Sequence, residues 1–199
     1  GLMLTKGATL VFQIHYTPSG RAVKTKTELG IKFRTTPPKE AIHTAAVSSI
    51  AFRLPPKNGE VVVNSDTKLR RDAKLLAMKP HMHLRGKAFR YEAELPDGTK
   101  HHLLEVKEYD FDWQHEYVLA EPLMLPKGTI IRVRAVFDNS EKNPYNPDPD
   151  EEVFFGLQTD EEMMIGYFTV EWEPGRRDWS KQGARIPEPE DEPAEDAGN

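Results

Sequence analysis

Two histidines separated by one residue carry the clearest chemistry in this 199-residue chain, in the run Lys79-Pro80-His81-Met82-His83. Pro80 favours an extended backbone here, because its ring fixes φ in the β and polyproline range. Side chains alternate along an extended segment, so His81 and His83 would share one face. Imidazole is the commonest metal-ligating side chain, and two neighbouring imidazoles can hold one ion. The spacing permits a metal site, but the motif is short enough to arise by chance, and two ordinary surface histidines satisfy it as well.

A second informative stretch follows about eighty residues later and contains Met163 and Met164. A methionine thioether is a soft ligand suited to Cu(I), and imidazole also suits copper, so two histidines and one methionine would favour copper over hard cations. Methionine also fills irregular cores, which leaves a packing role for Met163 as the alternative. In a strand, Met163, Ile165 and Tyr167 would share one face and Met164 the other. Alternation alone leaves both registers open, with either Met163 or Met164 as the ligand.

Composition excludes several kinds of site. Cysteine is absent, so disulfides, thiolate metal sites and iron–sulfur clusters cannot form from this chain. The formal charge of −5 is concentrated in residues 187–199, which carry six acids and no base. The remainder is close to neutral, so nucleic acid is not an expected partner. No apolar run approaches the roughly 18 residues that a membrane helix needs, so no membrane span is expected in this chain.

The pattern of short apolar and β-branched runs predicts an all-β fold. Turn sequences such as Pro55-Pro-Lys-Asn-Gly59 and Pro126-Lys-Gly128 separate these runs. Regular spacing of this kind is typical of an antiparallel β-sandwich with a jelly-roll-like arrangement. The expected strands are 41–52, 60–65, 74–83, 88–95, 101–107, 116–119, 129–138, 152–155 and 163–172.

Three regions are predicted along the chain. Residues 1–36 contain strand-like runs at 10–16 and 29–33, and two strands alone are marginal in water. We therefore expect them to be the last strands of a truncated, similar β-sandwich domain. The proline pair after residue 36 marks a boundary, and residues 37–175 form the candidate metal-binding sandwich. Residues 176–199 are predicted to be an acidic, proline-rich tail or linker without stable structure.

The combination of these motifs resembles the copper type II, ascorbate-dependent monooxygenases, which include peptidylglycine alpha-hydroxylating monooxygenase and dopamine beta-hydroxylase. In that family a His-x-His pair followed by a glycine precedes an acidic-Glu-Met segment that enters an aromatic strand. His81, His83, Gly86, Met163 and Tyr167 occur here in the same order and at similar spacing. The resemblance covers roughly residues 37–172.

The resemblance implies a copper site at which O2 is activated, with His81, His83 and Met163 as ligands. It also implies that Tyr167 and Lys79 contact substrate, and that His15 is a remnant ligand of a second, electron-transferring copper. Two departures bear on these details. Where the family usually has a cysteine after the ligand methionine, this chain has Met164. Where the peptide-processing member has an arginine before the first histidine, this chain has Lys79, which can bind an anion only as a point charge.

From the resemblance we expect a copper-dependent monooxygenase domain that hydroxylates C–H bonds within a larger chain. It would need O2, a small-molecule or peptide-like substrate and an external reductant or fused redox module. On its own, the chain is expected to bind copper and turn over poorly. A non-enzymatic copper-binding or sensing module is the alternative, and a metal-free docking domain is a third. A periplasmic, cell-envelope or extracellular location follows from the resemblance alone.

Overall fold

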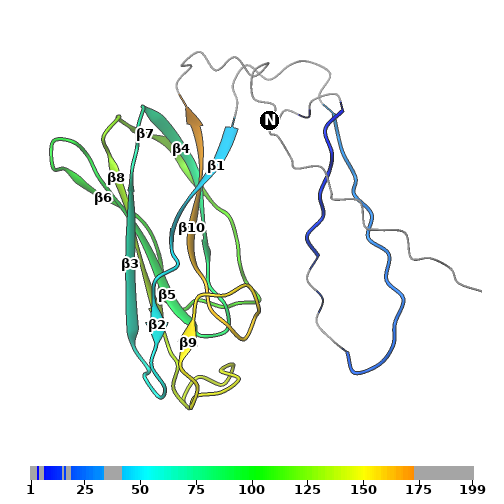
Figure 1. Ribbon diagram of the computed structural model, residues 1–199. Coiled ribbons are helices and arrows are strands. Elements are labelled where there is room, and N and C mark those ends of the chain that lie inside the picture. Colours follow the sequence, from blue (N-terminus) through cyan, green and yellow to red (C-terminus); the bar gives the residue numbers. More distant parts are fainter. Residues whose placement is uncertain (1–3, 5–6, 15, 17–18, 34–41, 173–199) are drawn as a thin grey trace, which may run out of the picture.

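Two antiparallel sheets packed face to face form the body of the protein in the computed structural model (Figure 1). The structure describes residues 4, 7–14, 16, 19–33 and 42–172. The first sheet has the strand order β1-β10-β4-β7, and the second has the order β3-β8-β5-β6. Eight strands in these two orders make the jelly-roll form of a β-sandwich. The all-β, antiparallel fold predicted from the sequence is therefore confirmed.

The strands follow the apolar runs of the sequence closely. Their bounds are β1 Ile42–Ser49, β2 Arg53–Leu54, β3 Val61–Lys68, β4 Ala73–His81, β5 Gly86–Glu94, β6 Lys100–Val106, β7 Tyr117–Leu125, β8 Ile130–Phe137, β9 Val153–Phe154 and β10 Met164–Trp172. The short strands β2 and β9 pair with each other as a separate two-stranded sheet, which the sequence pattern did not predict. Within the described residues there is no helix with the length and hydropathy needed to cross a membrane.

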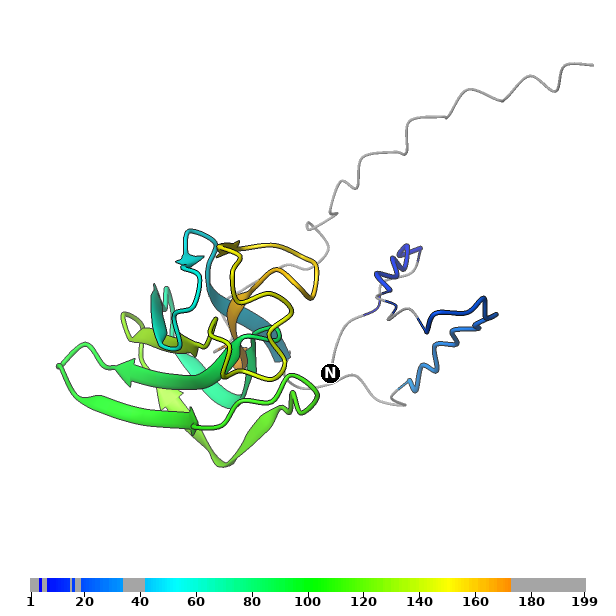
Figure 2. The same ribbon diagram turned by 90° about the horizontal axis from the view of Figure 1, so that it is seen from below.

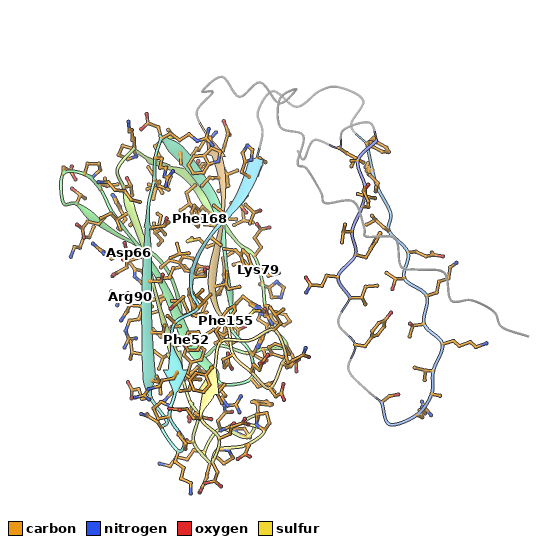
Figure 3. The ribbon with its side chains drawn as sticks, viewed as in Figure 1. Phe52, Asp66, Lys79, Arg90, Phe155 and Phe168 are labelled. Carbon is orange, nitrogen blue, oxygen red and sulfur yellow. The ribbon has the colours of Figure 1, made fainter. Side chains whose placement is uncertain are left out.

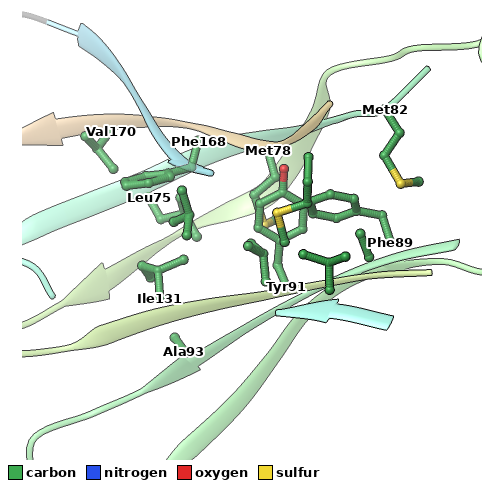
Figure 4. Packing of buried hydrophobic residues seen from close by; sticks show 14 of the residues in the cluster. Leu75, Met78, Met82, Phe89, Tyr91, Ala93, Ile131, Phe168 and Val170 are labelled. Atoms are coloured by element: carbon green, nitrogen blue, oxygen red, sulfur yellow. The ribbon is translucent and has the colours of Figure 1, made fainter. Parts of the chain in front are cut away.

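Alternating side chains from both sheets build the core. Tyr91 and Phe89 on β5 are fully buried, with ring centroids 5.1 Å apart. They pack beneath Met78 and Phe168 of the facing sheet, as the close view shows (Figure 4). The Tyr91 hydroxyl donates a hydrogen bond to the Tyr167 carbonyl at 3.1 Å, which ties the two sheets together. Burial of these apolar faces fixes the register of each strand, because a one-residue slip would turn its core side chains toward solvent.

Four strands, β1, β3, β4 and β7, end two or more residues from the predicted position, and for β4 and β7 the local structure gives the reason. β4 ends at His81 and not at His83. The reason is that the N–H and the carbonyl of Met82 are both hydrogen-bonded to the Tyr109 hydroxyl and not to a neighbouring strand. β7 continues past the predicted end to Leu125, although Pro122 cannot donate a ladder hydrogen bond. β7 lies at the edge of its sheet, and its register against β4 is irregular. Edge strands and irregular pairings are the places in a sheet where proline is tolerated.

The segment before residue 34 does not form the strands that its apolar runs predicted. Its described residues are extended around a bend at Gly20, but none is assigned to a strand. Large apolar side chains such as Phe12, Leu29 and Phe33 are exposed by 56%, 56% and 72%. An isolated pair of extended segments with no third strand gains little from pairing in water, which accounts for the difference. His15 and the predicted tail 176–199 lie outside the described residues.

Candidate metal centre

The two histidines lie at one end of the sandwich, where β4 ends and β10 begins. His81 is the last residue of β4 and pairs with Ile165 of β10. His83 lies two residues further on, in the turn before β5, and it is buried while His81 is half-buried. The two rings are 5.2 Å apart between centroids and meet at 84°. Two imidazoles bound to one metal at about 2.0–2.1 Å each, with a tetrahedral angle, would have centroids about 5 Å apart.

Hydrogen bonds select the tautomer of His81. Its Nδ1 lies 2.6 Å from Oε1 of Gln114. The amide nitrogen of Gln114 donates to the Phe111 carbonyl at 2.8 Å, which orients the amide oxygen toward the histidine. His81 therefore donates from Nδ1–H, and its neutral ring carries the free lone pair on Nε2.

His83 is set in the same way by a different element. Its Nδ1 lies 3.1 Å from the Glu161 carbonyl oxygen, which can only accept. Burial is the largest influence on both imidazoles and lowers the pKa of His81 and of His83. The lowered pKa favours the neutral form of each ring, and each Nδ1 has an acceptor that orients the ring, as is typical of metal-ligating histidines; the Gln158 backbone is a second hydrogen-bond partner of the His83 ring.

Met163 is half-buried and lies directly before the first residue of β10. β10 alternates strictly: Met164 is fully buried and belongs to the core between the sheets. Ile165, opposite His81, and Tyr167, opposite Lys79, point to the outer face, and Met163 precedes Ile165 by two residues. This arrangement favours Met163 over Met164 as the candidate ligand. Among the described residues, no group of three or more His, Cys, Asp or Glu side chains is arranged to hold a metal.

The two candidate substrate contacts share this outer face. Tyr167 and Lys79 are cross-strand partners, and the Tyr167 ring lies 6.4 Å from the ring of His81. Lys79 is exposed and points away from the space between the sheets, whereas Phe168 points into it (Figure 3). Both candidates are therefore accessible beside the histidine pair.

A buried carboxylate joins the two segments that carry the candidate ligands. Glu162 is fully buried, and its Oε2 accepts the N–H of His83 at 2.8 Å and that of Met163 at 3.1 Å. Its Oε1 accepts the N–H of Arg85 at 2.6 Å. Burial raises the pKa of Glu162 to about 7, against the three N–H groups and the Arg85 guanidinium, which lower it. The carboxyl fixes the backbone on both sides of the site.

Arg85 extends this support away from the site. Its side chain is fully buried, with Nε donating to Oδ1 of Asn139 at 2.8 Å and Nη1 donating to the Asp160 carbonyl at 2.5 Å. The Asn139 amide in turn donates to the carbonyls of Leu54, Pro55 and Glu151. Figure 2 looks onto this end of the sandwich, where the loops after β8 and β9 gather. The turn that carries His83 is therefore anchored to the loop after β8.

The loop between β6 and β7 supplies parts of the site that the sequence analysis missed. Tyr109 brackets the peptide between the two histidines: its hydroxyl accepts the Met82 N–H at 3.0 Å and donates to the Met82 carbonyl at 2.7 Å. Phe111 meets the His83 ring edge-on at 6.0 Å, and Gln114 orients His81. The loop has no strand or helix period, so its contacts could not be predicted. Its one signal is the dense aromatic composition of residues 109–113.

No protein-family model and no curated protein matches this chain.

Proposed function

We propose that the chain binds copper through Nε2 of His81, Nε2 of His83 and the thioether of Met163, and that it is the oxygen-activating domain of a copper-dependent monooxygenase. Bound copper would supply the redox chemistry by which O2 and an external reductant hydroxylate a C–H bond. The observation that carries the proposal is the pair of imidazoles 5.2 Å apart, each oriented by a hydrogen bond at Nδ1, at the end of the sheet where Met163 leads into β10.

The donor set supports copper over other common ions. Zinc and copper both accept imidazole, but a thioether adds affinity chiefly for Cu(I). Hard cations such as calcium and magnesium need several oxygen donors. Glu162 directs both carboxylate oxygens at backbone N–H groups, so its role here is to position the ligand segments.

The outer face beside His81 is the proposed substrate surface. Tyr167 offers an aromatic face and Lys79 a cation. The two residues are cross-strand partners, and each lies two residues along its strand from the pair formed by Ile165 and His81. Lysine would hold an anionic group of the substrate as a point charge and without the fixed geometry of an arginine. Electrons would come from an external reductant or a fused redox module, in a periplasmic, cell-envelope or extracellular setting.

Metal-binding titrations test the proposal. Competition with a Cu(I) chelator should give much tighter binding of Cu(I) than of Zn²⁺, and His81→Ala or His83→Ala should abolish tight binding of either ion. Met163→Ile keeps the apolar bulk and should weaken Cu(I) binding selectively. Met164→Ile is the matched control, because Met164 is a core residue. Unchanged Cu(I) affinity in Met163→Ile would leave a two-histidine site and would favour the non-enzymatic copper-binding alternative.

A further inference from the structure

Three cations line a hollow at the end of the sandwich away from the histidines. The hollow has a volume of about 430 Å³ and lies between the β3–β4 turn and the β7–β8 turn; it is lined by Thr67, Lys68, Leu69, Arg70, Lys127 and Gly128. The nine residues of β4 separate it from His81, a span of roughly 25–30 Å at about 3.3 Å per residue. It is therefore independent of the candidate metal centre.

Backbone hydrogen bonds hold the two turns of this basic hollow together. The Leu69 N–H donates to the Thr129 carbonyl at 2.8 Å, and the Gly128 N–H donates to the Leu69 carbonyl at 2.9 Å. The Lys127 N–H donates to Oδ1 of Asp72 at 2.5 Å. Gly128 has a φ of +92°, a conformation that other residues rarely adopt. The spacing of the cations is thus set by the fold.

The positive charge of the basic hollow is only partly offset within the part of the chain that the structure describes. Lys68, Arg70 and Lys127 are exposed and form no ion pair with any described residue. Of the acids nearby, Asp66 is 3.9 Å from Arg132 and Glu171 is 3.3 Å from Lys74. Asp72 accepts the Lys127 N–H and sets one negative charge against the three positive charges of the hollow, which stays cationic. An anionic partner from outside the described residues would complete this surface.

The chain itself supplies such a partner close by. β10 ends at Trp172, which pairs with Ala73 at the start of β4, next to the turn that forms the hollow. The guanidinium of Arg71 lies 4.5 Å from the centre of the Trp172 ring, which fixes where the chain leaves the sandwich. Figure 1 shows the end of β10 at the same end of the sandwich as the start of β4. Beyond it, residues 187–199 contain six acids and no base.

We propose that the acidic segment 187–199 docks on the basic hollow of its own chain. Residues 173–186 can reach up to about 45 Å when extended, far more than the docking requires. A short tether gives the segment an effective concentration in the millimolar range, so weak pairing of charges suffices. Screening at high ionic strength would release the segment from the hollow.

Paramagnetic relaxation enhancement tests this docking in the full chain. Because the sequence has no cysteine, Ala194→Cys provides a single position for a nitroxide label among the acids. At about 0.01 M salt, where the Debye length is about 30 Å, the amide signals of Leu69 and Gly128 should be broadened, and those of Arg85 and Phe111 should not. At about 1 M salt, where the Debye length is about 3 Å, the broadening should disappear.

Two triple variants show whether the basic hollow is the binding surface. Changing Lys68, Arg70 and Lys127 to serine should remove the broadening, whereas changing the exposed cations Lys107, Arg134 and Lys142 to serine should leave it intact. Broadening that persists in the first variant, or that spreads evenly over the surface, would overturn the proposal. So would broadening that requires a mixture of labelled and unlabelled molecules, because the segment would then dock on a second copy.

Discussion

The hydroxyl of Tyr109 offers the sharpest perturbation of the candidate site, because one oxygen atom serves both backbone groups of the residue between the histidines. Tyr109→Phe removes the acceptor of the Met82 N–H and the donor to the Met82 carbonyl, while it keeps the ring. The Met82 side chain is fully buried. Each buried polar group left without a partner costs about 1–3 kcal/mol, so the variant should lose about 2–4 kcal/mol of unfolding free energy after partial relaxation.

Urea unfolding followed by circular dichroism measures this loss, with Tyr145→Phe as the matched control. Tyr145 is 67% exposed, and its hydroxyl makes no hydrogen bond to a described residue, so its removal should change stability by less than about 0.5 kcal/mol. Tyr109→Phe should also weaken Cu(I) binding by about tenfold or more, because the peptide joining the two ligands loses its support. Equal stabilities of the two variants would refute the clamping role assigned to Tyr109.

Three further predictions concern the supports of the site. Glu162→Ala leaves three backbone N–H groups without an acceptor and should lower the free energy of unfolding, measured in urea, by more than about 3 kcal/mol. Glu161→Ala, at an exposed position, is the control and should lower it by less than about 1 kcal/mol. Similar losses in the two variants would show that Glu162 does not hold the ligand segments in place. Because burial raises the pKa of Glu162 from 4.5 to about 7, the folded state binds this proton more tightly than the unfolded state. The unfolding free energy relative to Glu162→Gln should therefore fall by roughly 3 kcal/mol as the pH rises through the range between these pKa values, and a flat difference would show that the carboxyl stays ionised. In Gly166→Ala the new methyl would lie 2.8 Å from Val133 Cγ1 and 3.0 Å from Tyr91 Cε1, so we expect a loss of about 1–3 kcal/mol. Adding Val133→Ala should cost less than the sum of the two single changes, and simple additivity would argue against the contact.

The sequence predicted the strands well, because each strand faces the core on one side and keeps a period of two. β10 is the clearest case, with every second residue from Met164 to Val170 buried. The same alternation placed Met163, Ile165 and Tyr167 together on the outer face. The misses occur where the backbone departs from this period. Pro122 hid the second half of β7, and the two-residue strand β2 is too short to show a pattern, whereas β9 lies within the predicted strand 152–155.

The chemistry of the candidate site was only partly predictable. The two histidines could be identified as candidate ligands from the sequence, because only one residue separates His81 from His83. The groups that hold them in one state come from elsewhere in the chain: Gln114 is 33 residues from His81, and Glu161 is 78 residues from His83. Such contacts depend on loop conformations that have no sequence period. Glu162 directly precedes Met163 in the sequence, but its burial could not be inferred from charge alone.

X-ray absorption at the copper edge tests the central claim most directly, because it counts sulfur ligands without reference to activity. The protein loaded with one equivalent of Cu(I) should show one sulfur and two imidazole nitrogens bound to the ion. The sulfur contribution should vanish in Met163→Ile and persist in Met164→Ile, whose side chain belongs to the core. Wild-type protein that binds Cu(I) without a sulfur ligand, or a sulfur signal that disappears in Met164→Ile, would contradict the assignment of His81, His83 and Met163 as the copper site.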